Sequence, residues 1–522
     1  MKSEQVEKAM KAAVILALAG IIAKILSAFY RIPFQNIVGN AGFYVYQQVY
    51  PIYGIGMTFA LSGFPVYLSK LVAKKDNPLA QIAMLKKIFN ILLVLGLLIF
   101  AFLQLKAHTL ALLMGDPGLA LLIKSVAWMF LFMPFLAVPR GYYQGTLRMI
   151  PVALSQVAEQ VIRVAVILVC ALCFAKYHWS LYQMGAYAML GSTFGAMGAL
   201  SVMLGFYRLF TPKAKVKVES YRFLAWHLAT DGIVICLFAS LMVLLQLVDS
   251  FTVMKNLSYS GLKIFEAQNI KGAYDRAQPL VQLGMALALG FSSSLLPALE
   301  RAKVKKQADL FLATAKTLLK ISLTLAMAAT VGMISIMPQL NTLLFGDCFL
   351  SQSLDVYVVS IVLMTLIGTF NAILQSLNYI KETVTALLAG IGVKILLNGP
   401  LIKMLGISGA SLATVLALLA ALGLIIKACP KEIRGLLDLT FSLKLSLACA
   451  MMWLAVFLAD LVLNLGAGRL MFGGEGLLLA LIGAVVFFVA VAYLKLFTKA
   501  EWLVLPKGEY LWQLVVKIRN EE

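Results

Sequence analysis

The chain carries one polar pattern twice, first as GFYVYQQVYPIYG at residues 42–54 and again as GAYDRAQPLVQLG at residues 272–284. Four residues recur at one constant offset, with Gly42, Tyr44, Gln48 and Gly54 matching Gly272, Tyr274, Gln278 and Gly284. The match continues at a nearly equal offset, pairing Ser62 with Ser292, Lys75 with Lys305, Gln144 with Gln375 and Arg163 with Lys394. Because polar residues carry the match, we interpret it as an internal repeat; chance matching of low-diversity apolar sequence is the alternative.

The composition places the chain in the membrane class. Of its 522 residues, 62% are hydrophobic and only 13% are charged, and the mean hydropathy is +0.92, whereas soluble proteins have roughly 25% charged residues. Apolar runs of about 20 residues recur, and each is long enough for a helix to cross a hydrocarbon core of about 30 Å. We therefore predict an all-α polytopic membrane protein. The first apolar run lacks a small-residue cleavage site, so we expect no cleavable signal peptide.

We expect 14 transmembrane helices, and the repeat groups the first 12 of them. The spans are expected at residues 10–30, 44–69, 88–105, 119–138, 153–175, 183–207, 223–248, 279–299, 310–337, 356–379, 384–402, 407–428, 441–463 and 476–497. An offset that bridges six spans leaves both copies in the same orientation, which predicts two parallel six-helix lobes at residues 1–220 and 221–430. Residues 431–522 have no counterpart and add two helices and a tail. Parallel repeats are typical of transporters whose substrate site lies at the repeat interface.

Lysine and arginine orient the chain. The net charge is +21, and most of the 44 Lys and Arg residues lie in the two tails and in the loops that follow even-numbered spans. Since an excess of these residues stays cytoplasmic, we expect both termini inside the cell. The positive charge is thus a topology signal, and we reject nucleic acid as a partner.

The sequence lacks motifs for catalysis or metal binding. Its six cysteines include a CxxC at Cys170 and Cys173, but this pair lies inside a span with no second pair, so we expect inert thiols rather than a metal site. We find no Walker-type phosphate loop, no nucleophile elbow and no dinucleotide-binding glycine pattern. We therefore expect no enzyme activity, no metal and no cofactor.

Several charged residues lie inside expected spans, where an ionised side chain costs roughly 2.5–3.5 kcal/mol on insertion scales and so faces the bundle interior or water. Guanidinium groups bind phosphate through two hydrogen bonds, and ammonium groups act as point charges. An inner surface with these groups suits a pyrophosphate better than a cationic drug. The residues expected to bind substrate come from both halves: Lys24, Arg31, Arg276, Lys394 and Asn398. Arg276 has the alternative of an ordinary outer-surface residue.

Three acidic residues of the spans are candidates for a coupling-ion site, and two of them have a structural alternative. Glu159 and Arg163 are spaced i, i+4 in the fifth span, so they form either a structural ion pair or part of a coupling-ion site. Asp231 and Asp249 in the seventh span are further coupling candidates, with an outer-surface position as the alternative for Asp249. We expect helix bends, as hinge candidates, at Pro51, Pro65, Gly284 and Gly290.

Three blocks of sequence resemble a known family. They are KILSAFYRIPFQNIVGNAGFYVYQQVYPIYGIGMTFALSGFPVYLSKLVA at 24–73, SQVAEQVIRV at 155–164 and GAYDRAQPLVQLGMALALGFSSSLLPALE at 272–300. Together they resemble the polysaccharide-transporter branch of the MOP flippase superfamily, and most of all the MurJ-type lipid II flippases of Gram-positive bacteria and stage V sporulation protein B. The chain departs from the family pattern at Ser27 and Ala277, where the family has glycine.

The resemblance implies a fold and a function. It implies a V-shaped pair of six-helix lobes, with a central cavity lined by spans one, two, seven and eight. The two added spans would form a hydrophobic groove for a polyprenyl tail. The cationic cavity residues of the family correspond to Lys24, Arg31 and Arg276. The implied activity is export of an undecaprenyl-pyrophosphate-linked saccharide, foremost the peptidoglycan precursor lipid II, from the inner to the outer leaflet by alternating access.

The same resemblance sets expectations for partners and driving force. We expect a monomer in the bacterial cell membrane that contacts membrane lipids. Association with the cell-wall synthesis machinery is a further expectation. Moving negative charge outward across an inside-negative membrane gains about 2.3 kcal/mol per charge per 100 mV, so the potential, or a coupling ion such as H+ or Na+, is expected to drive export. Alternatives are a flippase for an exopolysaccharide, teichoic-type or spore-cortex precursor, and a cation-coupled multidrug antiporter.

Overall fold

The chain is helical in the part that the computed structural model describes. The described residues are 19–20, 22–23, 25–210, 218–292, 295, 298–299, 302–303, 305–377, 379–463, 468–505 and 507–519, and they contain no β-strand. The predicted class, an all-α polytopic membrane protein, is confirmed by this architecture.

Eleven described helical stretches are long and apolar enough to cross a membrane. They are Ile25–Ala73, Pro78–Leu113, Pro117–Gly145, Met149–Tyr177, Leu181–Tyr207, Ala308–Ser335, Ser351–Ser376, Lys381–Leu405, Ile407–Ala428, Lys431–Val462 and Arg469–Tyr493. A twelfth span arises if Tyr221–Leu237 and Leu241–Tyr259, which are bent by 80°, count as one. About half of the expected span at 10–30 lies outside the described residues, and the span at 279–299 is described mainly as the 16-residue helix Ala277–Ser292. The count of 14 therefore stays a prediction.

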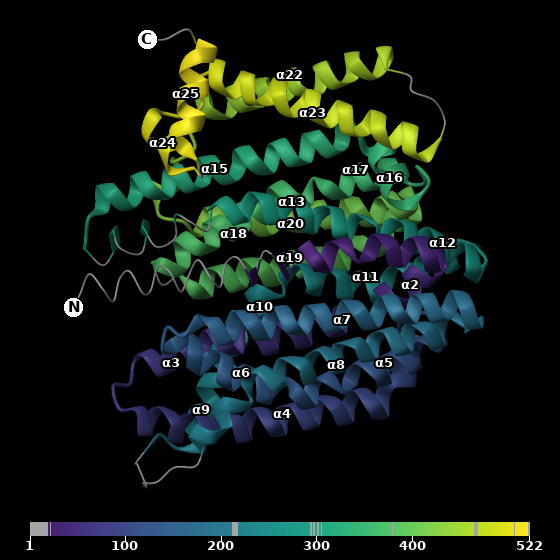
Figure 1. Ribbon diagram of the computed structural model, residues 1–522, viewed down its shortest axis with the longest axis vertical. Helices are drawn as coiled ribbons and strands as arrows, with labels where there is room; N and C mark the ends of the chain where they lie inside the picture. The colour runs from purple at the N-terminus through teal and green to yellow at the C-terminus, as the bar shows by residue number, and fades with distance from the viewer. Residues whose placement is uncertain are drawn as a thin grey trace. The chain divides into compact units, whose positions relative to one another are not determined.

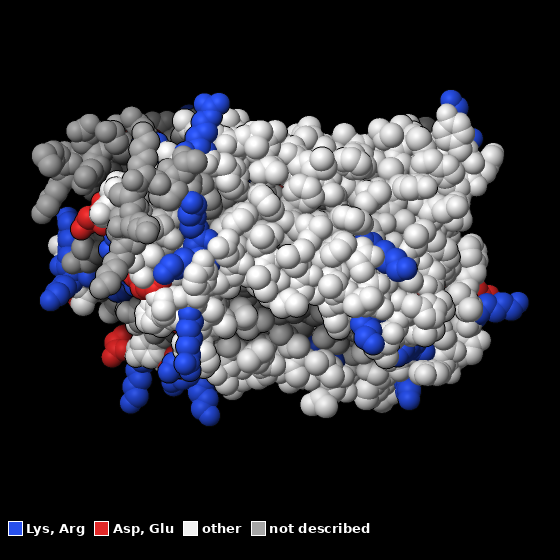
Figure 2. All heavy atoms as spheres, turned by 90° about the horizontal axis from the view of Figure 1, so that it is seen from below, with Lys and Arg blue, Asp and Glu red and all other residues white. Residues whose placement is uncertain are grey.

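Charged side chains are scarce on the middle of the surface seen in Figure 2. The face seen in Figure 2 has a wide uncharged surface, and most of its lysines and arginines gather at one end. An uncharged belt is what hydrocarbon requires of a helix surface, because a charge at the bilayer centre is costly.

The chain folds into two compact units. Unit 1 consists of Met1–Asp275 and Lys394–Ala410, and unit 2 consists of Arg276–Val393 and Ser411–Glu522. These units group residues by packing, whereas the expected lobes at 1–220 and 221–430 group them by repeat. The lobe boundaries and the added segment 431–522 stay a prediction.

Unit 1 is built from α-helices joined by short π-helical and 3-10 turns. Its elements are α2 (Arg31–Met57), η1 (Thr58–Ser62), α3 (Phe64–Ala73), α4 (Pro78–Leu113), η2 (Pro117–Leu119), α5 (Ala120–Ala127), α6 (Met129–Gly145), α7 (Met149–Tyr177), α8 (Leu181–Tyr207), η3 (Arg208–Phe210), α9 (Tyr221–His227), η4 (Leu228–Gly232), α10 (Ile233–Ala239), α11 (Leu241–Tyr259) and α12 (Ile264–Tyr274). Helices α4, α6, α8 and α7 pack in that order (Figure 1).

Unit 2 contains the helices that follow. They are α13 (Ala277–Ser292), α15 (Ala308–Ser335), α16 (Met337–Phe345), α17 (Ser351–Val358), α18 (Ser360–Ser376), α19 (Ile380–Leu405), α20 (Ile407–Ala428), α21 (Lys431–Arg434), α22 (Leu439–Val462), α23 (Arg469–Tyr493), α24 (Lys499–Val504) and α25 (Gly508–Arg519). The last part of α19 and the first turn of α20 belong to unit 1. Helix α15 packs against α13, α18 and α22, and α22 packs against α23.

The internal repeat is visible in the turns as well as in the sequence. Gly115 and Gly346 both have a positive φ, 83° and 93°, which glycine adopts without steric cost. Each precedes an aspartate whose Oδ1 accepts the backbone N–H two residues on, Gly118 for Asp116 at 3.1 Å and Phe349 for Asp347 at 2.9 Å. The helix after each turn is broken once, between α5 and α6 and between α17 and α18. The two halves thus repeat in local structure.

The hinge candidates lie at different kinds of position. Pro51 is buried inside α2, and Pro65 is in the first turn of α3 after the π-helical turn η1. The non-helical residue of α2 is Gly39, with φ 70° and ψ −179°, so the backbone breaks at a residue that we did not single out from the sequence. Gly284 packs closely on Ile361, which a Cβ would approach to 2.6 Å. Gly290 is in α13, and its surroundings lie outside the described part.

Close packing of α8 on α7 holds the charged stretch of α7 in place. A Cβ at Gly195 would lie 2.7 Å from the carbonyl oxygen of Glu159, and one at Gly191 would lie 3.1 Å from that of Arg163. Small residues allow membrane helices to approach at this distance. The backbone at both charged residues of α7 is therefore fixed by its neighbour.

Candidate functional site

Four tyrosines of unit 1 surround two buried arginines, and we call them the tyrosine box: Tyr30, Tyr46, Tyr50 and Tyr53. The guanidinium of Arg163, on α7, donates to the Tyr53 hydroxyl at 2.5 Å and to the Tyr30 hydroxyl at 2.8 Å. It also donates to Oε1 of Gln160 at 3.2 Å. Tyr30 and Tyr46 are joined through their hydroxyls at 3.1 Å. Arg163 is therefore held on two sides by neutral groups.

Arg31 is the second arginine in the tyrosine box. It is the first residue of α2 and is fully buried. Its guanidinium carbon lies 4.4 Å from the centre of the Tyr50 ring and 5.9 Å from that of Tyr30. None of its three guanidinium nitrogens has a hydrogen-bond partner within the described part of the chain. Buried donors without a partner cost about 1–3 kcal/mol, and more when charged, so this position favours an anionic acceptor.

Glu159 does not pair with Arg163, although the i, i+4 spacing allowed it. Its Oε2 accepts from Arg140 of α6 at 2.7 Å, and both side chains are buried. Arg140 also donates to the Ser155 hydroxyl at 3.1 Å and to the Ala60 carbonyl at 3.0 Å. The expected span ended at residue 138, but α6 continues to Gly145 and so places Arg140 in the packed interior. Glu159 is thereby neutralised across two helices.

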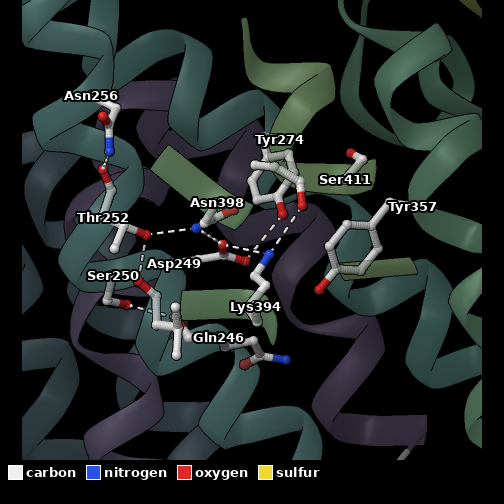
Figure 3. Close-up of polar contacts among 12 residues, drawn as sticks. Gln246, Asp249, Ser250, Thr252, Asn256, Tyr274, Tyr357, Lys394, Asn398 and Ser411 are labelled. Carbon is white, nitrogen blue, oxygen red and sulfur yellow. Dashed lines mark hydrogen bonds and ion pairs between the residues drawn. The ribbon is translucent and has the colours of Figure 1, made fainter. Parts of the chain in front are cut away.

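A second buried cluster surrounds Asp249 of α11 (Figure 3). Its Oδ1 lies 2.8 Å from the Lys394 ammonium and accepts from Asn398 at 2.9 Å, and its Oδ2 accepts from the Tyr274 hydroxyl at 3.1 Å. Asn398 also donates to Thr252 at 2.6 Å. The structure therefore brings together two residues expected to bind substrate and one expected to bind a coupling ion. In this arrangement Asp249 balances the charge of Lys394.

A further ion pair lies at the end of α12. The Lys271 ammonium is 2.5 Å from Oδ1 of Asp275, and both side chains are almost completely buried. Sequence reasoning missed Lys271, because we expected residues 249–278 to be an outer loop. The repeat was the available signal, since it aligns this stretch with the apolar copy around Gly42.

Arg276 is the first residue of unit 2 and is fully buried. Its guanidinium donates to both carboxylate oxygens of Asp347 at 2.6 and 2.9 Å and to Oδ1 of Asn341 at 3.0 Å. Burial by itself would raise the pKa of the Asp347 carboxyl. Hydrogen bonds from Arg276 and from the Phe349 backbone outweigh burial and lower that pKa below its usual value. Arg276 is thus held by an acid from the Gly-Asp turn.

The remaining predicted residues lie elsewhere. Lys24 is outside the described residues. Asp231 is exposed on the π-helical turn η4, whereas the polar contacts of Asp249 are made by Lys394, Asn398 and Tyr274. Among the described residues, no group of three or more His, Cys, Asp and Glu side chains is placed to hold a metal ion.

Asp116 forms a polar junction that sequence reasoning did not single out. Its carboxylate accepts from Tyr44 at 3.1 Å, from Tyr182 at 2.9 Å and from Gln268 of α12 at 3.1 Å. Gln48 of α2 donates to the Ser250 carbonyl of α11 at 2.7 Å. Tyr44 and Gln48, the two polar residues among the four that recur in the first motif, therefore anchor α2 within unit 1.

Unit 2 contains an apolar groove of about 650 Å³ between α15, α16, α22 and α23. Residues of the C-terminal segment also line it, including Trp502 of α24 and Leu511 of α25. The lining is almost entirely hydrocarbon, as in Leu325, Met333, Met452, Val456, Leu479 and Phe487. Such a lining suits an apolar chain, because burial of apolar surface is favourable and non-directional.

The sequence matches known proteins over most of its length. Residues 9–303 match the family model described as "Polysaccharide biosynthesis protein". The chain is 38% identical over 520 residues to "Uncharacterized membrane protein YabM" of Bacillus subtilis, covering 96% of this chain and 95% of that protein. It is 27% identical to "Lipid II flippase MurJ" of the same organism, covering 80% and 81%. It is 24% identical to "Stage V sporulation protein B" of that organism, covering 78% and 80%.

Solved structures share the fold. A structure of "Lipid II flippase MurJ, inward closed conformation" aligns with a TM-score of 0.68 at 15% identity, covering 92% of this chain and 99% of that one. An inward-facing multidrug resistance MATE family transporter of the MOP superfamily aligns with a TM-score of 0.62 at 15% identity, covering 81% and 98%. At such identity the likeness concerns the fold alone.

Proposed function

We propose that the chain, which belongs to the polysaccharide biosynthesis protein family, moves a lipid-linked pyrophosphate glycan from the inner to the outer leaflet, as its resemblance to the polysaccharide-transporter branch of the MOP flippase superfamily implies. Lipid II is the substrate that we place first, since a relative over four fifths of the chain is a lipid II flippase. The transport is by alternating access, without a chemical reaction on the substrate.

The observation that carries the proposal is the unpartnered guanidinium of Arg31. It is fully buried, with no hydrogen-bond partner for its nitrogens among the described residues. A pyrophosphate offers several anionic oxygens, and a guanidinium binds two of them in parallel. We assign the headgroup to this position in unit 1, and the roles of Lys24 and Arg276 in substrate binding stay predictions from the sequence.

The apolar groove of unit 2 supports a lipid-linked substrate. Its almost purely hydrocarbon lining suits a prenyl chain, because such a chain has no polar group that needs a hydrogen-bond partner. We propose that the tail of the substrate occupies this groove while the headgroup crosses the membrane.

The membrane potential supplies a direction for export. Outward movement of negative charge gains about 2.3 kcal/mol per charge per 100 mV in an inside-negative cell. A pyrophosphate therefore leaves the cytoplasmic side downhill without nucleotide hydrolysis. A coupling ion is an addition that this proposal does not require.

Multidrug antiport is the weaker alternative. The fold is shared with MATE transporters, but a cationic drug would meet the positive charges of Arg31 and Arg163 in the tyrosine box. A flippase for another lipid-linked glycan fits the same site equally well, because the saccharide lies beyond the phosphates that the arginines would bind.

Depletion and rescue tests the proposal. Bacteria lacking their own lipid II flippase receive this protein, Arg31→Gln, or Arg148→Gln as a matched control, since Arg148 is exposed. We expect growth with the parent and with Arg148→Gln, and none with Arg31→Gln at equal membrane abundance. Failure of the correctly inserted parent excludes lipid II and directs the test to cells that lack another glycan flippase.

A further inference from the structure

We propose that Arg163 and the tyrosine box form the second half of the pyrophosphate site and select a diphosphate over a monophosphate. This inference rests on the proposed function and concerns how the headgroup is recognised. We propose that Arg31 contacts the headgroup directly. Arg163 contributes a fixed positive charge near the headgroup without donating hydrogen bonds to it.

The two guanidiniums share the same aromatic rings. The guanidinium carbons of Arg31 and Arg163 lie 4.4 and 5.8 Å from the centre of the Tyr50 ring, and 5.9 and 5.3 Å from that of Tyr30. Ring faces attract cations, which allows two such groups to occupy one compartment. Their mutual repulsion remains, and in a poorly screened interior it is strong.

Neither arginine has a carboxylate within ion-pair distance in the described part of the chain, and Asp275, an acid whose charge Arg31 feels, is already bound by Lys271. The ion pairs found there include neither Arg31 nor Arg163. Glu159, one turn from Arg163, is bound to Arg140 instead. A buried charge without a partner is costly, so two of them in one compartment favour an anion with more than one negative charge. A pyrophosphate meets this requirement better than a single phosphate.

The two arginines differ in what their N–H groups do. Arg163 is tied to Tyr53, Tyr30 and Gln160, and its backbone is packed against the glycines of α8. Arg31 keeps all three nitrogens without a partner among the described residues. Arg31 is therefore free to donate to a ligand, while Arg163 contributes mainly its charge at a fixed position. This division makes Arg163 a specificity residue.

Binding of two lipids that differ by one phosphate tests the division. Purified full-length protein is titrated with undecaprenyl pyrophosphate and with undecaprenyl phosphate, and the ratio of the two dissociation constants is measured. We expect the parent to prefer the diphosphate and Arg163→Gln to lose about tenfold of that preference, because the variant lacks one fixed positive charge near the second phosphate. Arg163→Lys keeps the charge and should keep most of the preference. Arg31→Gln should weaken binding of both lipids.

A second variant guards against misfolding of Arg163→Gln. Tyr53→Phe retains the ring and both charges but removes the hydroxyl that positions Arg163, so we expect a preference between those of the parent and Arg163→Gln. The inference is overturned if folded Arg163→Gln has the same ratio of dissociation constants as the parent. If Arg163→Gln does not fold, the same ratio in Tyr53→Phe overturns it. Either result leaves the proposed function unchanged. Failure of the folded parent to bind the pyrophosphate lipid overturns both.

Discussion

Glu159 of α7 binds Arg140 of α6 at 2.7 Å and leaves Arg163, one turn farther along its own helix, to the hydroxyls of the tyrosine box. The choice of partner has a consequence for the charge of the site. If Glu159 were paired with Arg163, the tyrosine box would contain one positive charge without an ion-pair partner. With Glu159 engaged elsewhere, it holds two.

Replacement of Glu159 by glutamine should destabilise the protein strongly. It leaves Arg140 buried without a counter-charge, and breaking a buried pair in this way costs about 3–5 kcal/mol. Thermal unfolding in detergent measures the effect. The matched control is Glu219→Gln, which breaks a partly exposed pair with Lys75 and should cost at most about 1 kcal/mol. Equal losses in the two variants would show that the Arg140 pair is not the buried partnership described here.

The Asp249–Lys394 pair should behave as a unit. Asp249→Asn and Lys394→Met each leave one buried charge without its partner, so each single variant should unfold at a markedly lower temperature. The double variant removes both charges and should recover most of that loss, because a neutral replacement of a buried pair is often tolerated. Strictly additive losses in the double-mutant cycle would contradict the pairing.

Asp347 should make stability fall at acid pH. Its pKa in the folded protein is lowered by hydrogen bonds from Arg276 and the Phe349 backbone, and the usual value is about 3.9. The stabilisation is therefore complete above that usual value and is lost as the pH falls through the lower folded value. Unfolding temperature measured from pH 6 down to pH 3 should drop less steeply for Asp347→Asn. Parallel curves for the two proteins would refute this role.

Gly272 should tolerate no side chain. A Cβ at this residue of α12 would lie 2.0 Å from the carbonyl oxygen of Asn40 in α2, so Gly272→Ala forces the helices apart at an overpacking cost of about 1–3 kcal/mol. Gly474→Ala is the control, since a Cβ there meets nothing within 4 Å. The unfolding temperature of Gly474→Ala should match or exceed that of the parent, and an equal tolerance at Gly272 would mean that α12 does not pack on α2 this closely.

The sequence alone was sufficient to predict the all-α membrane class and the internal repeat. Hydrophobic runs specify helices that cross a membrane whatever their partners are, and the offset between Arg163 and Lys394 is the same as that between the two Gly-Asp turns. Arg31 was found because an arginine next to an apolar run is expensive unless it is used or paired. These inferences need only local sequence and the properties of the bilayer.

Partner choice could not be predicted in the same way. Arg140 and Glu159 are on different helices, and Asp249 and Lys394 lie still farther apart in the sequence, so each pairing depends on helix packing and on rotamers. The i, i+4 rule favoured Arg163 for Glu159 because it considers a single helix. Lys271 was missed for a related reason, since its burial comes from the fold of α12 and not from an apolar run around it.

The central claim is that the buried guanidinium of Arg31 binds the pyrophosphate that is moved. The most direct test uses vesicles that contain purified protein and have an inside-negative membrane potential. It measures the rate at which a fluorescent undecaprenyl-pyrophosphate glycan moves from the inner to the outer leaflet of the vesicle membrane. We predict outward movement with the parent and with Arg148→Gln, and a loss of at least about tenfold with folded Arg31→Gln. Movement by Arg31→Gln at the rate of the parent would contradict the account.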